Sequence, residues 1–129
     1  MLDDKNVTFD TNRARDYFLD RISYSLGPVE LNHLIKNDLD HFTLTDVRKY
    51  DDYIDGHIPF AMHLPINELE EHLNMFDKCK INIIYCYNSS CKLATKMCLK
   101  LAEKGYPVME LSGGYKTWEK FGFDIIKES

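Results

Sequence analysis

The sequence has no long apolar run, no block of basic residues and no signal-like N-terminus. A membrane-spanning helix needs about 20 consecutive apolar residues, so we expect no membrane partner. The formal net charge of −5 argues against binding a nucleic-acid backbone. The opening stretch MLDDKNVTFD is acidic and polar, whereas a secretory signal is basic and then apolar. The sequence therefore predicts a cytoplasmic protein.

The cysteines are few, and their spacing fits no shared structural site. Six, four and six residues separate the four of them, which matches no common zinc-binding pattern. A disulfide framework is not expected in a cytoplasmic chain of this size. We therefore predict no metal and no cofactor, and each cysteine is judged by its own position. The four are Cys79, Cys86, Cys91 and Cys98.

What is present is an alternation of strand-like and helix-like patterns along 129 residues, 44% of them hydrophobic. That is enough for one globular domain with a buried core. The alternation predicts an α/β domain with a mainly parallel sheet covered on both faces. Strands are expected at 41–47, 61–65, 81–86 and 106–111, with a short edge strand at 22–24. Helices are expected at 10–21, 28–37, 49–56, 66–75, 92–104 and 115–122.

The first part of the chain reads as an appendage. We predict a helical extension at 1–21 and the main domain at 22–129, with Asp10 or Thr11 as the helix cap. The helix carries one apolar stripe, which could cover the chain's own core or pack against a second copy in a homodimer. The stripe consists of Ala14, Tyr17, Phe18 and Ile22.

The stretch INIIYCYNSSCKLATK at 81–96 places Cys86 where a buried strand ends and a helix follows. In open α/β sheets, ligands bind at the carboxyl ends of the strands. A helix N-terminus adds unpaired N–H groups and about half a positive charge. Backbone amides curled around the sulfur, together with Lys92 and Lys96, are expected to lower the pKa of the Cys86 thiol. The alternative is a small buried residue that merely ends a strand.

Several segments, in order, resemble the single-domain rhodanese-like sulfurtransferases across about residues 22–126. They are DVRKYDDYIDGHIPFAMHLP at 46–65, INIIYC at 81–86 and EKGYPVMELSGGYKTW at 103–118. The resemblance implies a parallel sheet of about five strands with helices on both faces. It also implies that Cys86 takes sulfane sulfur from a donor as a persulfide and passes it to a thiophilic acceptor. The implied anion-binding loop is Tyr87, Asn88, Ser89, Ser90, Cys91 and Lys92.

The loop departs from the usual sulfurtransferase pattern, which is shorter and often carries Arg or Lys. Residues 87–90 have no charge, and the Cys-x4-Cys pattern resembles one subgroup of single-domain rhodanese-like proteins. A loop without a cation should hold thiosulfate, a small dianion, poorly. We therefore expect a bulkier small-molecule donor or a protein persulfide. The dual-specificity cell-cycle phosphatases share the implied fold, but phosphatase activity is disfavoured because the loop lacks their Arg.

Other residues near the strand ends have alternative roles. Cys91 could attack the persulfide or form a disulfide with Cys86, or it could fill space at the helix N-terminus, which is favoured. Asp46 and Arg48 could support the pocket or form a structural ion pair, and we favour the ion pair. His57 is expected to fix a turn by a hydrogen bond rather than to act as a base.

A rhodanese-like fold alone does not decide between catalysis and binding, because function depends on the site. The leading hypothesis is a sulfurtransferase that uses Cys86. The alternative is a non-enzymatic module that binds a partner or senses redox state through Cys86 and Cys91.

Overall fold

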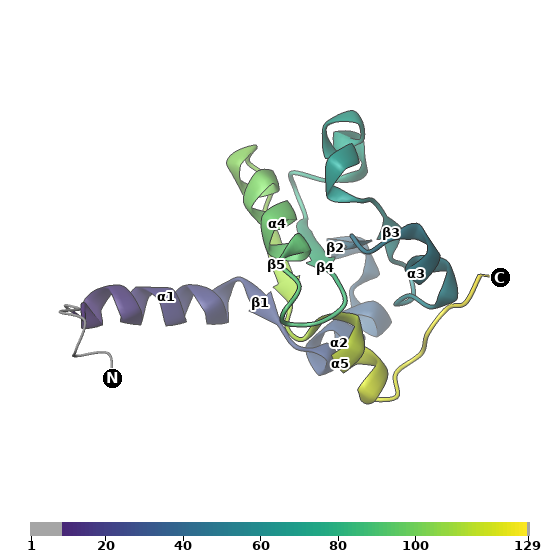
Figure 1. Ribbon diagram of the computed structural model, residues 1–129, viewed down its shortest axis with the longest axis horizontal. Helices are drawn as coiled ribbons and strands as arrows, with labels where there is room; N and C mark the ends of the chain where they lie inside the picture. The colour runs from purple at the N-terminus through teal and green to yellow at the C-terminus, as the bar shows by residue number, and fades with distance from the viewer. Residues whose placement is uncertain (1–8, 129) are drawn as a thin grey trace.

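The computed structural model describes residues 9–128, which form one five-stranded sheet with helices on both faces (Figure 1). The strand order is β1-β5-β4-β2-β3, and every neighbouring pair is parallel. This is the predicted α/β architecture, with β4 at the centre. The strands are β1 (Ser25–Leu26), β2 (Phe42–Asp46), β3 (Met62–His63), β4 (Ile81–Tyr85) and β5 (Val108–Leu111).

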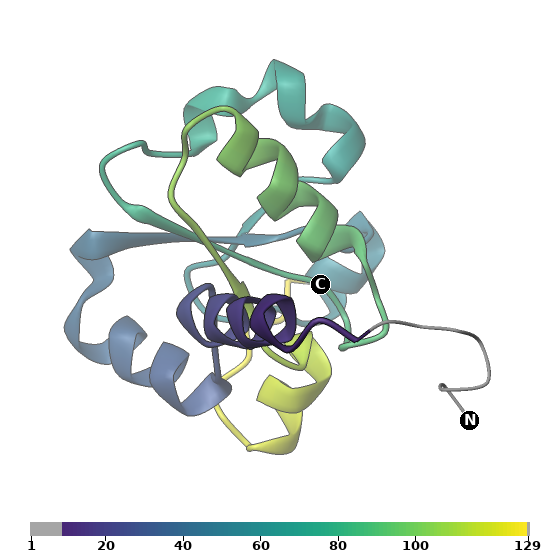
Figure 2. The ribbon, with the colours of Figure 1, turned by 90° about the vertical axis from the view of Figure 1, so that its left-hand side faces the viewer.

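Helices cover the two faces of the sheet as separate layers (Figure 2). One face packs against α2 and α5, and the other packs against α4 and a 3-10 segment, η3. The remaining short elements lie in the connections. The helices are α1 (Thr11–Ser23), α2 (Pro28–Asn37), η2 (Leu39–His41), α3 (Tyr50–Asp55), η3 (Ile66–Glu71), η4 (Leu73–Met75), α4 (Leu93–Glu103) and α5 (Gly114–Lys120).

The central strand β4 contributes to both cores because its side chains alternate between the two faces. Ile83 and Tyr85 pack in the cluster beneath α2 and α5, whereas Ile84 and Cys86 pack in the cluster beneath α4. All four side chains are buried. Full burial of one large aliphatic side chain contributes about 1.5–3 kcal/mol, so this alternation fixes the register that places Cys86 on the α4 face.

Two helices begin as their sequences predict. The Asp10 carboxylate caps α1 by accepting the backbone N–H of Arg13 at 3.0 Å. Before α2, the backbone N–H of Gly27 donates to the Glu30 carboxylate at 3.1 Å. Pro28 occupies the first helical position, where a missing N–H costs nothing.

Helix α1 extends away from the sheet rather than covering it (Figure 1), and none of its residues is buried. Tyr17, Phe18 and Ile22 are 58%, 55% and 76% exposed. The apolar stripe of α1 therefore does not serve the chain's own core.

No helix in the described part of the chain has the length and apolar character needed to cross a membrane.

Two local predictions are corrected. Residues 66–75 form the 3-10 helices η3 and η4 instead of one α-helix. The three-residue spacing of Ile66 and Leu69 suits the 3-10 repeat, and His72 interrupts it. The edge strand forms at Ser25–Leu26 rather than at 22–24, because α1 continues to Ser23.

Candidate functional site

Cys86 follows β4 directly and lines a cavity of about 460 Å³ at the carboxyl edge of the sheet. Four parts of the chain form its walls: the last turns of α1, the loop after Cys86, the start of α4 and the end of β5. Parallel strands bring their carboxyl ends to one edge, where ligands bind in open α/β sheets. The lining residues are Tyr17, Asp20, Arg21, Tyr24, Ser25, Cys86, Asn88, Ser89, Lys92, Thr95, Glu110, Leu111, Ser112, Gly113 and Gly114.

The surroundings of Cys86 raise the pKa of its thiol. The side chain is buried, and its sulfur lies 3.5 Å from the carbonyl oxygen of Cys91 and 3.8 Å from that of Asn88. Burial and a hydrogen bond with the Cys91 thiol raise the pKa of Cys86 to about 12, although the backbone N–H of Ala94 acts in the opposite direction. The lowered pKa expected from the sequence is therefore not found.

The physical reason lies in how the loop amides are used. The side-chain oxygen of Asn88 accepts the backbone N–H groups of Ser90 and Cys91, both at 3.1 Å. The N–H of Cys91 also points to the carbonyl oxygen of Asn88 at 3.2 Å. These two amides bond within the loop, so they do not bond to the sulfur. From α4, the N–H of Ala94 does reach the sulfur.

The start of α5 fixes the chain on the other side of Cys86. The backbone N–H of Tyr115 donates to the carbonyl of Cys86, and that of Lys116 donates to the carbonyl of Tyr87, both at 2.8 Å. Gly114 makes this contact possible, because a Cβ there would lie 2.6 Å from the Cys86 carbonyl oxygen. Its φ of 64° also favours glycine.

Asp46 and Arg48 form a buried ion pair away from the Cys86 cavity. The guanidinium donates to the Asp46 carboxylate through Nε at 3.0 Å and Nη2 at 2.7 Å, and it also donates to the Gly56 carbonyl. It stacks over the Tyr115 ring at 4.1 Å. The pair joins β2 to α3 and α5, which agrees with the favoured structural interpretation.

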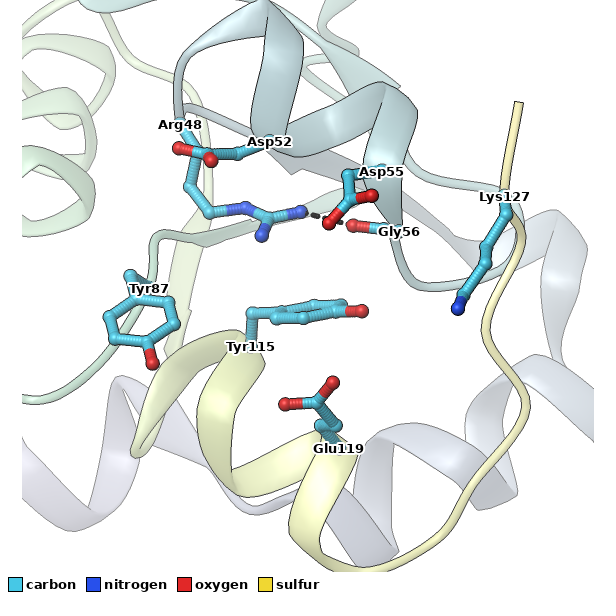
Figure 3. Close-up of a pocket in the computed structure, with 8 residues that line it drawn as sticks. All are labelled: Arg48, Asp52, Asp55, Gly56, Tyr87, Tyr115, Glu119 and Lys127. Atoms are coloured by element: carbon cyan, nitrogen blue, oxygen red, sulfur yellow. Dashed lines mark hydrogen bonds between the residues drawn. The ribbon is translucent and has the colours of Figure 1, made fainter. Parts of the chain in front are cut away.

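Arg48 lines a second cavity, of about 430 Å³, which has no cysteine among its lining residues (Figure 3). Tyr87 lines this second cavity instead of the one at Cys86. The Tyr115 ring lies between the Arg48 guanidinium and the Glu119 carboxylate (Figure 3). Of the predicted loop residues, Asn88, Ser89 and Lys92 line the Cys86 cavity together with Cys86 itself.

Two other predicted side chains have structural contacts. The His57 ring donates its Nδ1–H to the carbonyl oxygen of Tyr53 at 2.8 Å and stacks on the Tyr53 ring at 3.8 Å, so it does fix this turn. Cys98 is partly buried against the core beneath α4, and burial raises its pKa to about 12. Within residues 9–128, no three His, Cys, Asp or Glu side chains converge to hold a metal ion.

Sequence reasoning missed two walls of the Cys86 cavity. Glu110 and Thr95 meet across it, the Thr95 hydroxyl lying 2.9 and 3.0 Å from the two carboxylate oxygens. The place of Glu110 near the end of a predicted strand was the available signal, because that strand ends at the same edge as Cys86. The contribution of Tyr17 and Arg21 from α1 had no such signal.

Comparison with known proteins agrees with this geometry. The family model of the rhodanese-like domain matches residues 28–121, which is most of the chain and includes the whole Cys86 loop. This chain belongs to the rhodanese-like family.

Relatives within the rhodanese-like family include named sulfurtransferases. Thiosulfate sulfurtransferase GlpE of Coxiella burnetii is 35% identical over 77 residues, which cover 59% of this chain and 70% of GlpE. Putative sulfurtransferase YtwF of Bacillus subtilis is 29% identical over 76 residues, which cover 59% of this chain and 72% of YtwF. The crystal structure of BH2092 from Bacillus halodurans is 31% identical with a TM-score of 0.81, covering 92% of this chain and 87% of that one. These likenesses support a general role in sulfur transfer.

Proposed function

We propose that this protein is a sulfurtransferase that carries sulfane sulfur as a persulfide on Cys86. The observation that carries the proposal is the position of Cys86, which directly follows the central strand and lines a cavity of about 460 Å³ together with residues at the start of α4. Relatives named sulfurtransferases support the reaction class. We also assign the chain to the subgroup with a Cys-x4-Cys loop, on the spacing of Cys86 and Cys91, and to a cytoplasmic location.

The reaction has two covalent steps. The Cys86 thiolate attacks the sulfane sulfur of the donor, and the bond between that sulfur and the donor breaks with its electron pair leaving on the donor. Cys86 then carries the sulfur as a persulfide. A thiophilic acceptor attacks the outer sulfur, and the Cys86 thiolate leaves with the electron pair of the S–S bond. The backbone N–H of Ala94 is in place to stabilise negative charge on the Cys86 sulfur.

Activation requires a change in the loop, because the thiolate is the nucleophile and the described conformation favours the thiol. The amides of Ser90 and Cys91 are held by the Asn88 side chain. Donor entry that releases this clasp frees two N–H groups for the sulfur. Hydrogen bonds to a charged group favour its charged form, so the released amides would lower the pKa of Cys86.

The second candidate is a redox module, and it is favoured by the contact between the thiols of Cys86 and Cys91. In this case the Cys91 thiolate attacks the inner sulfur of a Cys86 persulfide, and hydrosulfide leaves. The product is a Cys86–Cys91 disulfide, which a cellular thiol can reduce.

Mass spectrometry separates the two candidates. The protein is incubated with thiosulfate or with an organic persulfide, trapped by alkylation and digested. We expect the peptide with Cys86 to gain the mass of one sulfur atom, and the Cys86→Ser variant to gain none while Cys98→Ser behaves like the wild type. A Cys86–Cys91 disulfide without any trapped persulfide under either donor would favour the redox module.

A further inference from the structure

Glu110 is a charged group fixed beside the nucleophile on a neighbouring strand. Glu110 on β5 pairs with Ile84 on β4, and Ile84 lies two positions before Cys86. Its backbone N–H donates to the Tyr24 carbonyl at 2.9 Å, which ties β5 to the start of β1. Strand pairing on both sides therefore leaves the Glu110 backbone little freedom to move away from the cavity.

The carboxylate of Glu110 accepts a hydrogen bond from a side chain of α4. The Thr95 hydroxyl on α4 lies 2.9 and 3.0 Å from the two carboxylate oxygens, and both residues line the Cys86 cavity. This hydrogen bond favours the position of the carboxylate between β5 and α4. The cavity thus contains a fixed negative charge between β5 and α4.

Among the described charged side chains that line the cavity, Glu110 is the one on the strand next to Cys86. Among the described residues, the cavity's other charged lining groups are Asp20 and Arg21 from the last turns of α1, and Lys92 before α4. The loop at 87–91 has no charge. The charge of Glu110 contributes to the raised pKa values of Cys86 and Cys98.

We propose that Glu110 determines donor specificity by repelling dianionic sulfur donors from Cys86 while it admits organic hydropersulfides. The inference rests on the proposed sulfur transfer by Cys86. Thiosulfate brings two negative charges and leaves as sulfite, also a dianion, so repulsion from a fixed carboxylate opposes both its binding and its transition state. An organic hydropersulfide, R–S–SH, carries at most one charge at the reacting group.

The two donors transfer sulfur to Cys86 by the same kind of displacement and differ in their leaving groups. With thiosulfate, the Cys86 thiolate bonds to the outer sulfur, the S–S bond of thiosulfate breaks, and sulfite leaves with the electron pair. With an organic hydropersulfide, the Cys86 thiolate bonds to the terminal sulfur and R–S⁻ leaves, while the proton stays on the transferred sulfur. Glu110 forms no bond in either case and acts only through its charge.

The test compares kcat/KM for thiosulfate and for cysteine hydropersulfide in the wild-type protein, in Glu110→Gln and in the control Glu103→Gln. The glutamine keeps the size of Glu110 and a carbonyl oxygen for the Thr95 hydroxyl, while Glu103 is exposed on α4 and does not line the cavity. We expect Glu110→Gln to raise the thiosulfate-to-hydropersulfide ratio by about tenfold, mainly through KM for thiosulfate. Glu103→Gln should leave the ratio unchanged.

A measurement on the wild-type protein gives independent evidence. Added salt screens repulsion between charges, so the thiosulfate rate should rise with ionic strength while the hydropersulfide rate stays nearly constant.

If Cys86 accepts sulfur but Glu110→Gln and wild type show the same donor ratio, the role of Glu110 is overturned and the sulfurtransferase proposal stands. If Cys86 gains no sulfur from either donor in any of the three proteins, both proposals are overturned.

Discussion

At the scale of single residues, the reactivity of Cys86 depends on which groups the loop amides bond to. Asn88 accepts the N–H groups of Ser90 and Cys91 with its side chain, and two loop carbonyl oxygens face the sulfur instead. Carbonyl oxygens favour a protonated thiol, whereas N–H donors favour a thiolate. The Asn88 side chain therefore withholds two N–H donors from the sulfur, in addition to the burial and the Cys91 contact that raise the pKa of Cys86.

Replacement of this side chain tests that account. In Asn88→Ala the amide of Ser90 loses its side-chain acceptor and that of Cys91 keeps only the backbone carbonyl of residue 88. Both amides are then freer to turn to the sulfur, so the pKa of Cys86 should fall from its raised value of about 12. Each unit by which it falls increases the thiolate fraction below the pKa by about tenfold. The rate of Cys86 alkylation by iodoacetamide, followed from neutral to alkaline pH, should therefore rise at lower pH than in the wild type.

Ser89→Ala is the matched control for this measurement, because Ser89 lies in the same loop and lines the same cavity. Its alkylation profile should follow that of the wild type. An unchanged midpoint in Asn88→Ala would show that the Asn88 clasp does not set the protonation of Cys86.

The sequence predicted the position of Cys86 at the end of a buried strand but not the direction of the shift in its pKa. The sequence shows where an apolar strand ends before a helix, because the hydrophobic periods of strands and helices differ. This boundary drew attention to Cys86. The bonds of the Asn88 side chain depend on the loop conformation, and Glu110 and Thr95 meet only through tertiary packing. Those features could not be obtained from spacing along the chain.

At the scale of elements, the junction of β4 and α5 holds the reactive loop. The first amides of α5 bond to the carbonyls of Cys86 and Tyr87, so the helix start and the strand end share one framework. Most elements were predicted because their apolar patterns are regular. The predicted α-helix at 66–75 was wrong. The spacing of Ile66, Leu69 and Leu73 is compatible with an α-helical apolar stripe, but the chain forms the 3-10 helices η3 and η4, which meet at His72.

Gly114→Ala should disrupt this junction. The new Cβ would lie 2.6 Å from the Cys86 carbonyl oxygen and 2.8 Å from that of Tyr87, at a φ of 64°. We expect a loss of about 1–3 kcal/mol in the free energy of unfolding, measured by urea denaturation, together with slower sulfur transfer by Cys86.

Gly105→Ala separates backbone strain from the clash. Gly105 also has a positive φ, of 90°, but a Cβ there meets nothing within 4 Å. It should cost about 1 kcal/mol of stability and leave sulfur transfer unchanged. Equal effects of the two substitutions on transfer would argue against a special role for the β4–α5 junction.

At the scale of the whole molecule, α1 is attached to the site but not to the core. No residue of α1 is buried, yet Tyr17, Asp20 and Arg21 line the Cys86 cavity. The sequence predicted this helix and its apolar stripe, since both follow from local periodicity. The sequence could not predict which part of the fold α1 approaches, because that depends on the angle between α1 and β1, the strand that follows it.

Removal of the chain before Ser23 should therefore separate stability from substrate binding. We expect the free energy of unfolding to change by less than about 1 kcal/mol, because α1 buries none of its side chains. The KM for an organic hydropersulfide should rise, because three lining side chains are lost from the cavity. Urea denaturation and steady-state kinetics measure the two effects.

Leu19→Ala provides the control, since Leu19 lies on α1 and is not among the lining residues. It should leave KM unchanged. A truncated protein that unfolds, or one that keeps the wild-type KM, would contradict the separation.

Helix α1 forms part of the wall of the Cys86 cavity without supporting the core. Natural variation in α1 is therefore free of the packing constraints that act on the sheet. Homologous chains should accordingly diverge fastest in the stretch before β1, and their preferences for sulfur compounds should drift apart while their melting temperatures stay close.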